Sequence, residues 1–117
     1  MNGSIKYVVA LVLLFSPPAF ATDAFSGAED LYGWCSSMDK DDVHWGLCVG
    51  SVVAVHDTIM TYQSFEEMRE VICIGADVSR GDLVITVMEY MTENPDVMDY
   101  SLGDVVFTAL RDAYPCK

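Results

Sequence analysis

The chain has 117 residues and a formal net charge of −12 at pH 7. A chain of this size forms one domain with a single core. Its acidic excess excludes nucleic acids and anionic membranes as partners, because like charges repel, and it favours a basic or neutral partner. The same excess also keeps a protein soluble, so charge alone does not establish that such a partner exists.

The first 21 residues have the pattern of a cleaved signal peptide. Lys6 forms a short basic segment, residues 7–15 are an uninterrupted apolar run, two prolines follow, and residues 19–21 read Ala-Phe-Ala, a typical cleavage motif. A membrane anchor needs roughly 18 or more apolar residues, about twice this run. We therefore expect cleavage after Ala21, an exported mature domain of residues 22–117, and no stable membrane anchor.

Two helices are expected in the first half of the mature domain. The first runs from about Ala28 to Met38, with Ser26 or Gly27 at its cap and acidic residues in its first turn, where the helix dipole favours them. A polar loop, 38–45, follows. The second runs from about Trp45 to Tyr62; its valines also suit a strand, but its length and lack of alternation favour a helix. Its expected apolar stripe is Val49, Val52, Val53, His56 and Met60.

Two more helices are expected in the second half. A polar connection leads to the apolar segment 68–74, which is either the end of a bent helix or a loop packed under the domain. Ser79 and Asp82 then resemble a capping box, and the helix that they start ends at Asn94-Pro95. We expect it to bury Leu83, Val84, Val87, Met88 and Met91.

The last helix, from about Asp99 to Tyr114, has the clearest stripe: Leu102, Val105, Val106, Ala109, Leu110 and Ala113. The sequence thus predicts an all-α domain of four to five helices.

Four cysteines remain in the mature domain, and an even number in a small exported domain predicts two disulfides. Cys35 ends the first helix and Cys48 opens the second, so an antiparallel turn brings them together. Cys73 precedes the third helix and Cys116 follows the fourth, so antiparallel packing of that pair does the same. We predict the pairs Cys35–Cys48 and Cys73–Cys116, each stabilising the fold by roughly 2 to 4 kcal/mol.

The residues that catalyse reactions or bind metals form no convincing cluster. A zinc site from Cys35, His44 and Cys48 lacks a C-x-x-C pair and lies in a chain expected to be oxidised. The acidic residues Asp39, Asp41 and Asp42 are similar to a calcium loop, but Val43 and Gly50 occupy positions where that loop needs ligands, so we expect a solvated loop.

Two short catalytic patterns are also unconvincing. Residues 37–40 match S-x-x-K, a four-residue motif without its usual companions. His56 and Asp57 are neighbours on one helix, and we expect them to point about 100° apart rather than to form a dyad. His56 fits better as a hydrogen-bonded residue of the core.

Five short motifs follow one another over nearly the whole mature chain: Leu31–Cys35, Cys48–Asp57, Cys73 with Val78–Leu83, Glu93–Pro95 and Ala109–Cys116. In this order and spacing they resemble the Rap/Tai family of periplasmic immunity proteins, which protect bacteria against type VI secreted peptidoglycan amidases. The resemblance implies an all-helical, disulfide-bonded fold, often a homodimer, that binds a cell-wall amidase and blocks its active-site cleft.

We therefore expect a periplasmic immunity protein that is not an enzyme and needs no cofactor or metal ion. Aromatic anchors beside acidic residues are the expected binding group, since aromatic side chains dominate interface energies. The group comprises Trp45, Tyr62, Phe65, Glu66, Glu67 and Met68. The alternatives are a periplasmic acid-stress chaperone, which exposes apolar surface when its carboxylates are protonated, and a hydrolase with an unrecognised site.

Overall fold

The computed structural model describes residues 26–37, 42–65 and 68–117. These residues form four α-helices and one 3-10 helix, with no strand among them, which confirms the all-α prediction. In chain order they are α2 (Ala28–Ser36), α3 (Asp42–Ser64), α4 (Arg80–Glu93), η1 (Pro95–Asp99) and α5 (Leu102–Ala113).

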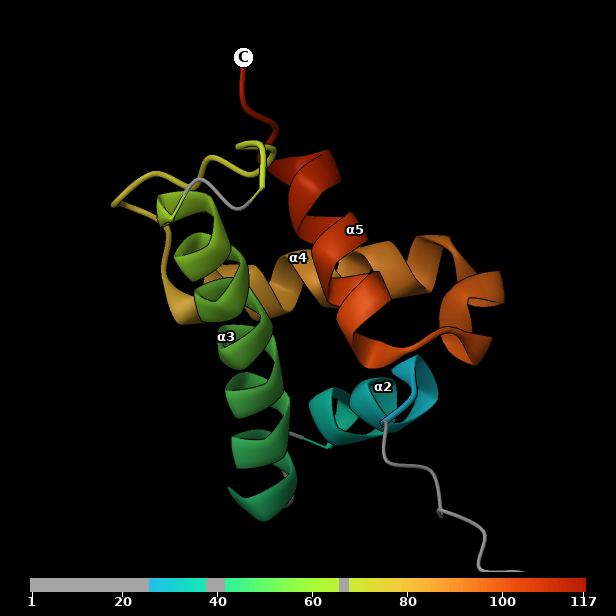
Figure 1. Ribbon diagram of the computed structural model, residues 1–117. Coiled ribbons are helices and arrows are strands. Elements are labelled where there is room, and N and C mark those ends of the chain that lie inside the picture. The colour runs from blue at the N-terminus through green and yellow to red at the C-terminus, as the bar shows by residue number, and fades with distance from the viewer. Residues whose placement is uncertain (1–25, 38–41, 66–67) are drawn as a thin grey trace, which may run out of the picture.

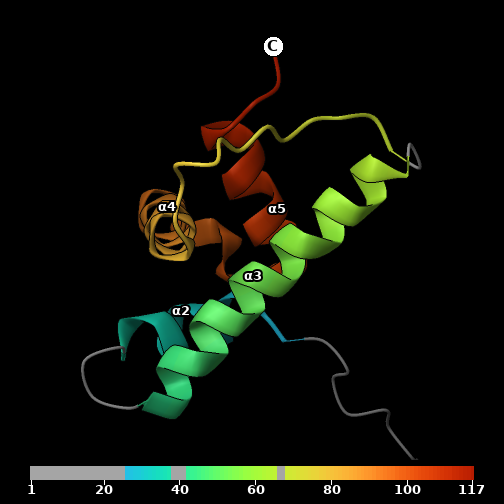
Figure 2. The ribbon, with the colours of Figure 1, turned by 90° about the vertical axis from the view of Figure 1, so that its left-hand side faces the viewer.

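α3 is the longest helix and packs against α2, α4 and α5. Figure 1 shows α3 along one side of the domain, with the other three α-helices beside it. Figure 2, turned by 90°, shows α3 in front and the chain after it running back past the end of α5 toward α4. The face of α3 that is turned away from the other helices is therefore free to meet solvent or a partner.

Helix α3 is longer at both ends than the sequence predicted. It begins at Asp42, inside the expected polar loop, and it continues two residues beyond Tyr62. The rest of that loop, 38–41, lies outside the described residues. α2 ends at Ser36, two residues before the predicted Met38. The two added residues at the end of α3 matter because they place Gln63 inside the helix.

Two helix starts carry the caps that the sequence predicted. At α2 the N–H of Gly27 donates to the Asp30 carboxylate at 3.1 Å, which is half of a capping box because glycine has no side chain to complete it. At α4 both halves form: Ser79 N–H donates to Asp82 at 2.8 Å, and Asp82 N–H donates to Ser79 Oγ at 3.1 Å. The backbone N–H of Ser79 first, and its hydroxyl second, lower the pKa of the Asp82 carboxyl group.

The start of the last helix was predicted too early. Residues Pro95–Asp99 form the separate 3-10 helix η1, and α5 starts only at Leu102. Ser101 explains this break, because its Oγ accepts from the N–H of Asp104 at 3.3 Å and so caps a new helix. Ala113, expected in the buried stripe of α5, is exposed at the end of the helix.

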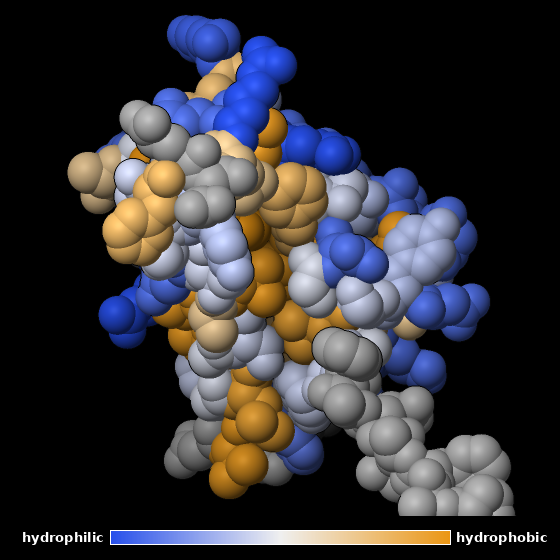
Figure 3. Space-filling model, in the orientation of Figure 1, coloured by the Kyte–Doolittle hydropathy of each residue, from blue (hydrophilic) through white to orange (hydrophobic). Residues whose placement is uncertain are grey.

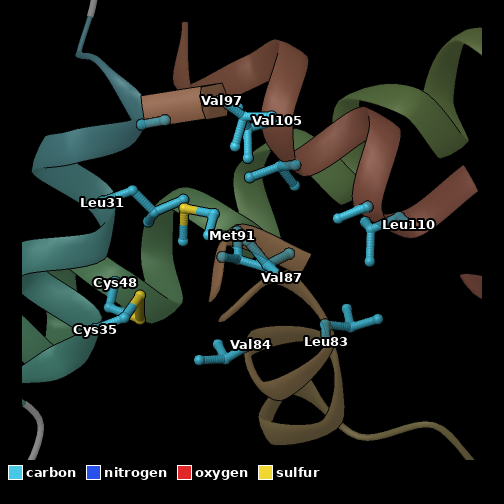
Figure 4. Packing of buried hydrophobic residues seen from close by; sticks show 14 of the residues in the cluster. Leu31, Cys35, Cys48, Leu83, Val84, Val87, Met91, Val97, Val105 and Leu110 are labelled. Atoms are coloured by element: carbon cyan, nitrogen blue, oxygen red, sulfur yellow. A yellow bond between two sulfur atoms is a disulfide. The ribbon is translucent and has the colours of Figure 1, made fainter. Parts of the chain in front are cut away.

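The core lies where α2, α4 and α5 meet α3. Figure 4 shows Leu31 of α2 lying toward Met91 of α4, with Val105 and Leu110 of α5 in the same cluster. On α4, four of the five expected residues are buried, and Met88 is half-buried against the core. The largest fully buried side chains are Leu31, Ile72, Met91, Leu110, Val52, Val87, Val105, Val106, Cys35 and Cys48.

The predicted inward stripe of α3 was right at Val52 and wrong in its rotation about the helix axis, since Val49, Val53 and Met60 are only half-buried. The residues that α3 buries are Cys48, Val52, Ile59 and Gln63, whereas His56 is only half-buried. Apolar residues occur on all sides of α3, so hydrophobic periodicity defines its inward face poorly. The Cys35–Cys48 disulfide turns Cys48 toward α2 and thereby sets the rotation.

The segment between α3 and α4 is a packed loop, the second of the two structures considered for 68–74. Ile72 is buried and pairs with Pro115 through an isolated antiparallel bridge. Cys73 N–H donates to Tyr114 O at 2.9 Å, and Cys116 N–H donates to Val71 O at 3.4 Å. A second bridge, between Gly27 and Ser101, joins the start of α2 to the cap of α5.

By length and composition alone, Val43–Ser64 is long and apolar enough to cross a membrane. In the structure this helix packs against α2, α4 and α5, and a disulfide joins it to α2. Only 17% of its most apolar window is buried within the domain. Exposed apolar surface of this kind marks interaction sites, so α3 is a candidate partner-binding surface.

Candidate partner-binding surface

Both predicted disulfides are present, and they lie in different environments. Cys35 and Cys48 are joined in the core, with 1% and 0% of their surface exposed. Cys73 and Cys116 are joined near the end of α3, where Cys73 is exposed and Cys116 half-buried. No free cysteine remains, so the chain has no thiolate for nucleophilic chemistry or metal binding.

Gln63 connects the end of α3 to the exposed disulfide. Its Oε1 accepts from the N–H groups of Val71 at 3.0 Å and Ile72 at 3.2 Å, and its Nε2 donates to Ile72 O at 3.0 Å. Val71 and Ile72 directly precede Cys73. The last turn of α3 is therefore attached through one side chain to a segment that the Cys73–Cys116 bond holds from the other side.

Two aromatic side chains project from this anchored turn. Tyr62 is 54% exposed and Phe65 is 71% exposed, and the N–H of Phe65 still donates to Thr61 O at 3.2 Å. We call Tyr62 and Phe65 the aromatic end of α3. Large exposed aromatics on a fixed backbone have the properties of interface anchors, since they bury much area and lose little backbone freedom on binding.

The other expected binding residues have different surroundings. Trp45 and Met68 are half-buried and pack against the core cluster. Glu66 and Glu67 lie outside the described residues. The structure therefore places Tyr62 in the last turn of α3 with Phe65 directly after the helix, and places Trp45 in the first turn of the same helix.

A second apolar surface lies between α3 and α5. A hollow of about 360 Å³ is lined by Ala54, Val55, Thr58 and Ile59 of α3 and by Gly103 and Phe107 of α5. Figure 3 shows apolar side chains along the groove between these helices and at the N-terminal end of α3. Arg111 stacks over the Phe107 ring, 5.7 Å from its centroid, and pairs with Asp112 at 3.2 Å.

His56 and Asp57 do contact each other, contrary to the prediction. His56 Nδ1 lies 2.9 Å from Asp57 Oδ1, because the two side chains bend toward each other after leaving the helix in different directions. They lie at a hollow of about 330 Å³ between α3 and the start of α4, with Arg80 on its rim. The residues lining this hollow include no hydroxyl or thiol, so the pair has no nucleophile beside it to activate.

The structure also decides the two other chemical patterns as far as its described residues allow. The zinc alternative fails, because Cys35 and Cys48 are bonded to each other. Ser37 Oγ donates to Gly33 O at 2.9 Å, and its S-x-x-K partner Lys40 lies outside the described residues. Within the described ranges, no three His, Cys, Asp or Glu side chains lie close enough to hold a metal ion.

Sequence reasoning missed Gln63. It placed the end of the helix at Tyr62 and assigned the following residues to a polar connection. The signal that was available is the spacing of Cys48, Val52, Ile59 and Gln63, which share one helical face four and seven residues apart. Extending the face defined by Cys48, rather than the valine stripe, places Gln63 in the core.

Comparison with known proteins supports the same fold and the same class of function. A family model that describes the Rap1a immunity proteins matches residues 27–116, a range that contains all four α-helices and both disulfides. A search of curated proteins found no match, and neither did a search of solved structures. The chain belongs to the Rap1a family of immunity proteins, and an immunity protein acts by binding a cognate effector.

Proposed function

We propose that this immunity protein acts in the periplasm, where it binds a peptidoglycan amidase delivered by type VI secretion and blocks its active-site cleft. The observation that carries the proposal is the aromatic end of α3, where Tyr62 and Phe65 are exposed on a turn fixed by Gln63 and the Cys73–Cys116 disulfide. A cleft is blocked most effectively by a rigid projection, since no binding energy is lost in ordering it.

The proposed binding group includes two acidic residues next to the aromatic end of α3 in the sequence. Glu66 and Glu67 belong to it from the sequence, and Met68 follows them directly. Trp45 belongs to it from the sequence alone, because it lies in the first turn of α3, at the opposite end of the helix from Tyr62. The net charge of −12 favours approach to a basic cleft, because opposite charges raise the rate of encounter. The aromatic pair then supplies the contacts that slow dissociation.

The proposed mechanism requires no catalysis, cofactor or metal ion. The protein prevents substrate from entering the amidase cleft, so its effect depends on one-to-one binding rather than on turnover. Peptidoglycan hydrolysis by the amidase should therefore fall in proportion to the molar ratio of the two proteins and stop near equivalence.

Periplasmic action rests on the predicted signal peptide, residues 1–21, and on the two disulfides, which fit an oxidising compartment. The test is protection of cells that receive a type VI amidase in the periplasm. Expression of the full chain should rescue growth, and a version without residues 1–21 should not. Equal protection by both versions would contradict periplasmic action.

Acid protection, co-purification with the amidase and fragment release from peptidoglycan separate the alternatives. A chaperone would protect cells against acid without forming a complex with the amidase, and a hydrolase would release fragments from peptidoglycan on its own. We expect neither. The amidase should instead co-purify with the chain, and mutation of the aromatic end of α3 should abolish both co-purification and rescue.

We also propose that two copies associate, as the family resemblance implies. The groove between α3 and α5 is the candidate contact, since it is apolar. Ala54→Arg should then convert a dimer to a monomer in light scattering without lowering the melting temperature. A wild-type chain that is monomeric at about 100 μM would contradict this part of the proposal.

A further inference from the structure

We infer that Gln63 is the positioning residue of the binding surface: its carboxamide holds the aromatic end of α3 in a fixed place beside the segment 71–73. The inference rests on the function proposed above, and it adds a residue that touches no partner itself. On this inference, the orientation of Tyr62 and Phe65 in the unbound protein depends on one buried side chain.

The first observation is the complete use of the Gln63 carboxamide. Gln63 is the one buried polar side chain in the described part of the chain, with 8% of its surface exposed. Its oxygen accepts two backbone N–H groups, and its nitrogen donates to Ile72 O and lies 4.0 Å from the sulfur of Met60. A glutamine has two acceptor sites and two donors, so every one of them has a neighbour here.

The second observation is what the segment 71–73 lacks without Gln63. It belongs to no sheet, and its other backbone partners lie on the C-terminal side, at Tyr114 and Cys116. The N–H groups of Val71 and Ile72 and the carbonyl of Ile72 would lose the partner that Gln63 gives them. The Gln63 carboxamide thus satisfies the backbone groups that a neighbouring strand would satisfy in a sheet.

The third observation connects this attachment to the exposed aromatics. Tyr62 precedes Gln63 directly, and Phe65 follows in the turn closed by its bond to Thr61 O. Because the turn and the segment 71–73 are joined through Gln63, a shift of one moves the other. Loss of the carboxamide should release the turn and lower the fraction of molecules whose aromatics are correctly placed.

A lower competent fraction has a kinetic signature that loss of stability alone does not have. The apparent dissociation constant rises by the inverse of that fraction, and the change appears in the association rate, because a correctly placed molecule dissociates as before. A residue that merely stabilises the fold would leave both rate constants unchanged at temperatures well below melting.

The experiment compares Gln63→Met, which keeps the length of the side chain and removes its hydrogen bonds, with Val97→Ala. Val97 is a buried residue of η1, which packs against α2 and α4. Its variant serves as the control for a general loss of stability. The probe is the amidase against which the exported chain protects cells. Amide hydrogen exchange of the free variants supplies a readout that needs no partner.

We expect Gln63→Met to speed exchange of the Val71 and Ile72 amides roughly 100-fold or more, and to lower the association rate about 10-fold with an unchanged dissociation rate. Val97→Ala should do neither. Gln63→Glu keeps acceptors for the two N–H groups but turns a second carboxylate oxygen toward Ile72 O, which repels it, so both measurements should change in the same direction. It replaces Gln63→Met if that variant does not fold.

Two outcomes would overturn the inference: unchanged exchange at Val71 and Ile72, or faster exchange with an association rate equal to that of Val97→Ala. A wild-type chain that binds no amidase would contradict the proposed function instead. The exchange data would then still decide whether Gln63 holds the segment 71–73.

Discussion

The two disulfides differ in burial and in how much apolar packing surrounds them. Cys35–Cys48 lies in the core, where α2 and α3 pack around it and apolar contacts already hold the chain. Cys73–Cys116 lies near the surface, where the segment 71–73 has a single fully buried residue, Ile72. The first bond reinforces packing, whereas the second replaces it. The disulfide holds the segment 71–73, and the hydrogen bonds of Gln63 hold the end of α3, with its two exposed aromatics, to that segment.

The largest expected effect is on the buried bond. Its sequence separation of 13 residues gives about 3 kcal/mol of loop-closure stabilisation, and two alanines would leave a cavity that costs about 1 to 2 kcal/mol more. We expect Cys35→Ala/Cys48→Ala to lower the free energy of unfolding by about 4 to 5 kcal/mol, measured by urea denaturation. A loss below about 2 kcal/mol would mean that packing alone holds α2 to α3.

The exposed bond should differ in what it affects. Its separation of 43 residues predicts about 4 kcal/mol from loop closure, with little cavity cost at an exposed site. Cys73→Ala/Cys116→Ala should therefore destabilise slightly less and also weaken amidase binding at temperatures where the domain stays folded. Each single variant should be as damaging as the other. Binding that survives in the folded double variant would separate this disulfide from function.

Phe65→Ala tests the aromatic end of α3 without touching either bond. With 71% of its surface exposed, Phe65 contributes little to folding, and we expect less than about 0.5 kcal/mol of lost stability. As an interface anchor it should contribute about 2 kcal/mol, seen as roughly 30-fold faster dissociation of the amidase. Leu47→Ala, an exposed residue of α3 beside the buried disulfide, is the matched control and should leave dissociation unchanged.

The acidic charge should act on association instead. Raising salt from about 0.05 to 0.5 M shortens the Debye length from roughly 14 Å to about 4 Å, so steering toward a basic cleft weakens. We expect the association rate to fall about 10-fold, and Glu66→Lys/Glu67→Lys to lower it at constant salt, in stopped-flow measurements. Rates that ignore both salt and charge reversal would leave the acidic residues with a role in solubility alone.

The smallest expected effect lies at the start of α4, which neither disulfide joins directly. Ser79→Ala removes half of the capping box and should cost about 1 kcal/mol. Because the pKa of Asp82 is lower in the folded state than its ordinary 3.8, its contribution is present above that value and is lost as pH falls through the folded pKa. The destabilisation caused by Ser79→Ala should therefore shrink at low pH, in pH-dependent urea denaturation.

The sequence was most informative where one residue type has one physical role. Cysteine parity and helix ends predicted both disulfides, and Ser79 with Asp82 predicted the start of α4. It was least informative on α3, where apolar residues surround the helix and the valines suggested the wrong inward face. Gln63 was missed for the same reason, since a buried polar residue is explained only by the backbone groups that it satisfies.

The binding group remains a prediction, and the structure adds how two of its members are held. Tyr62 and Phe65 were proposed as anchors from residue type, and the structure shows them exposed on an attached turn. The attachment itself depends on residues nine positions apart, Gln63 and Ile72, which no local pattern connects. The His56–Asp57 contact likewise depends on side-chain torsions, which helical spacing does not determine.

Amide hydrogen exchange of the chain, free and bound to the amidase that it protects against, tests the central claim most directly. If the aromatic end of α3 enters the amidase cleft, binding should slow exchange at the Phe65 amide and in the segment 71–73, with no change at the α2–α3 junction around Cys35 and Cys48. Protection at that junction with none at Phe65 would place the binding surface on the opposite region and contradict the account.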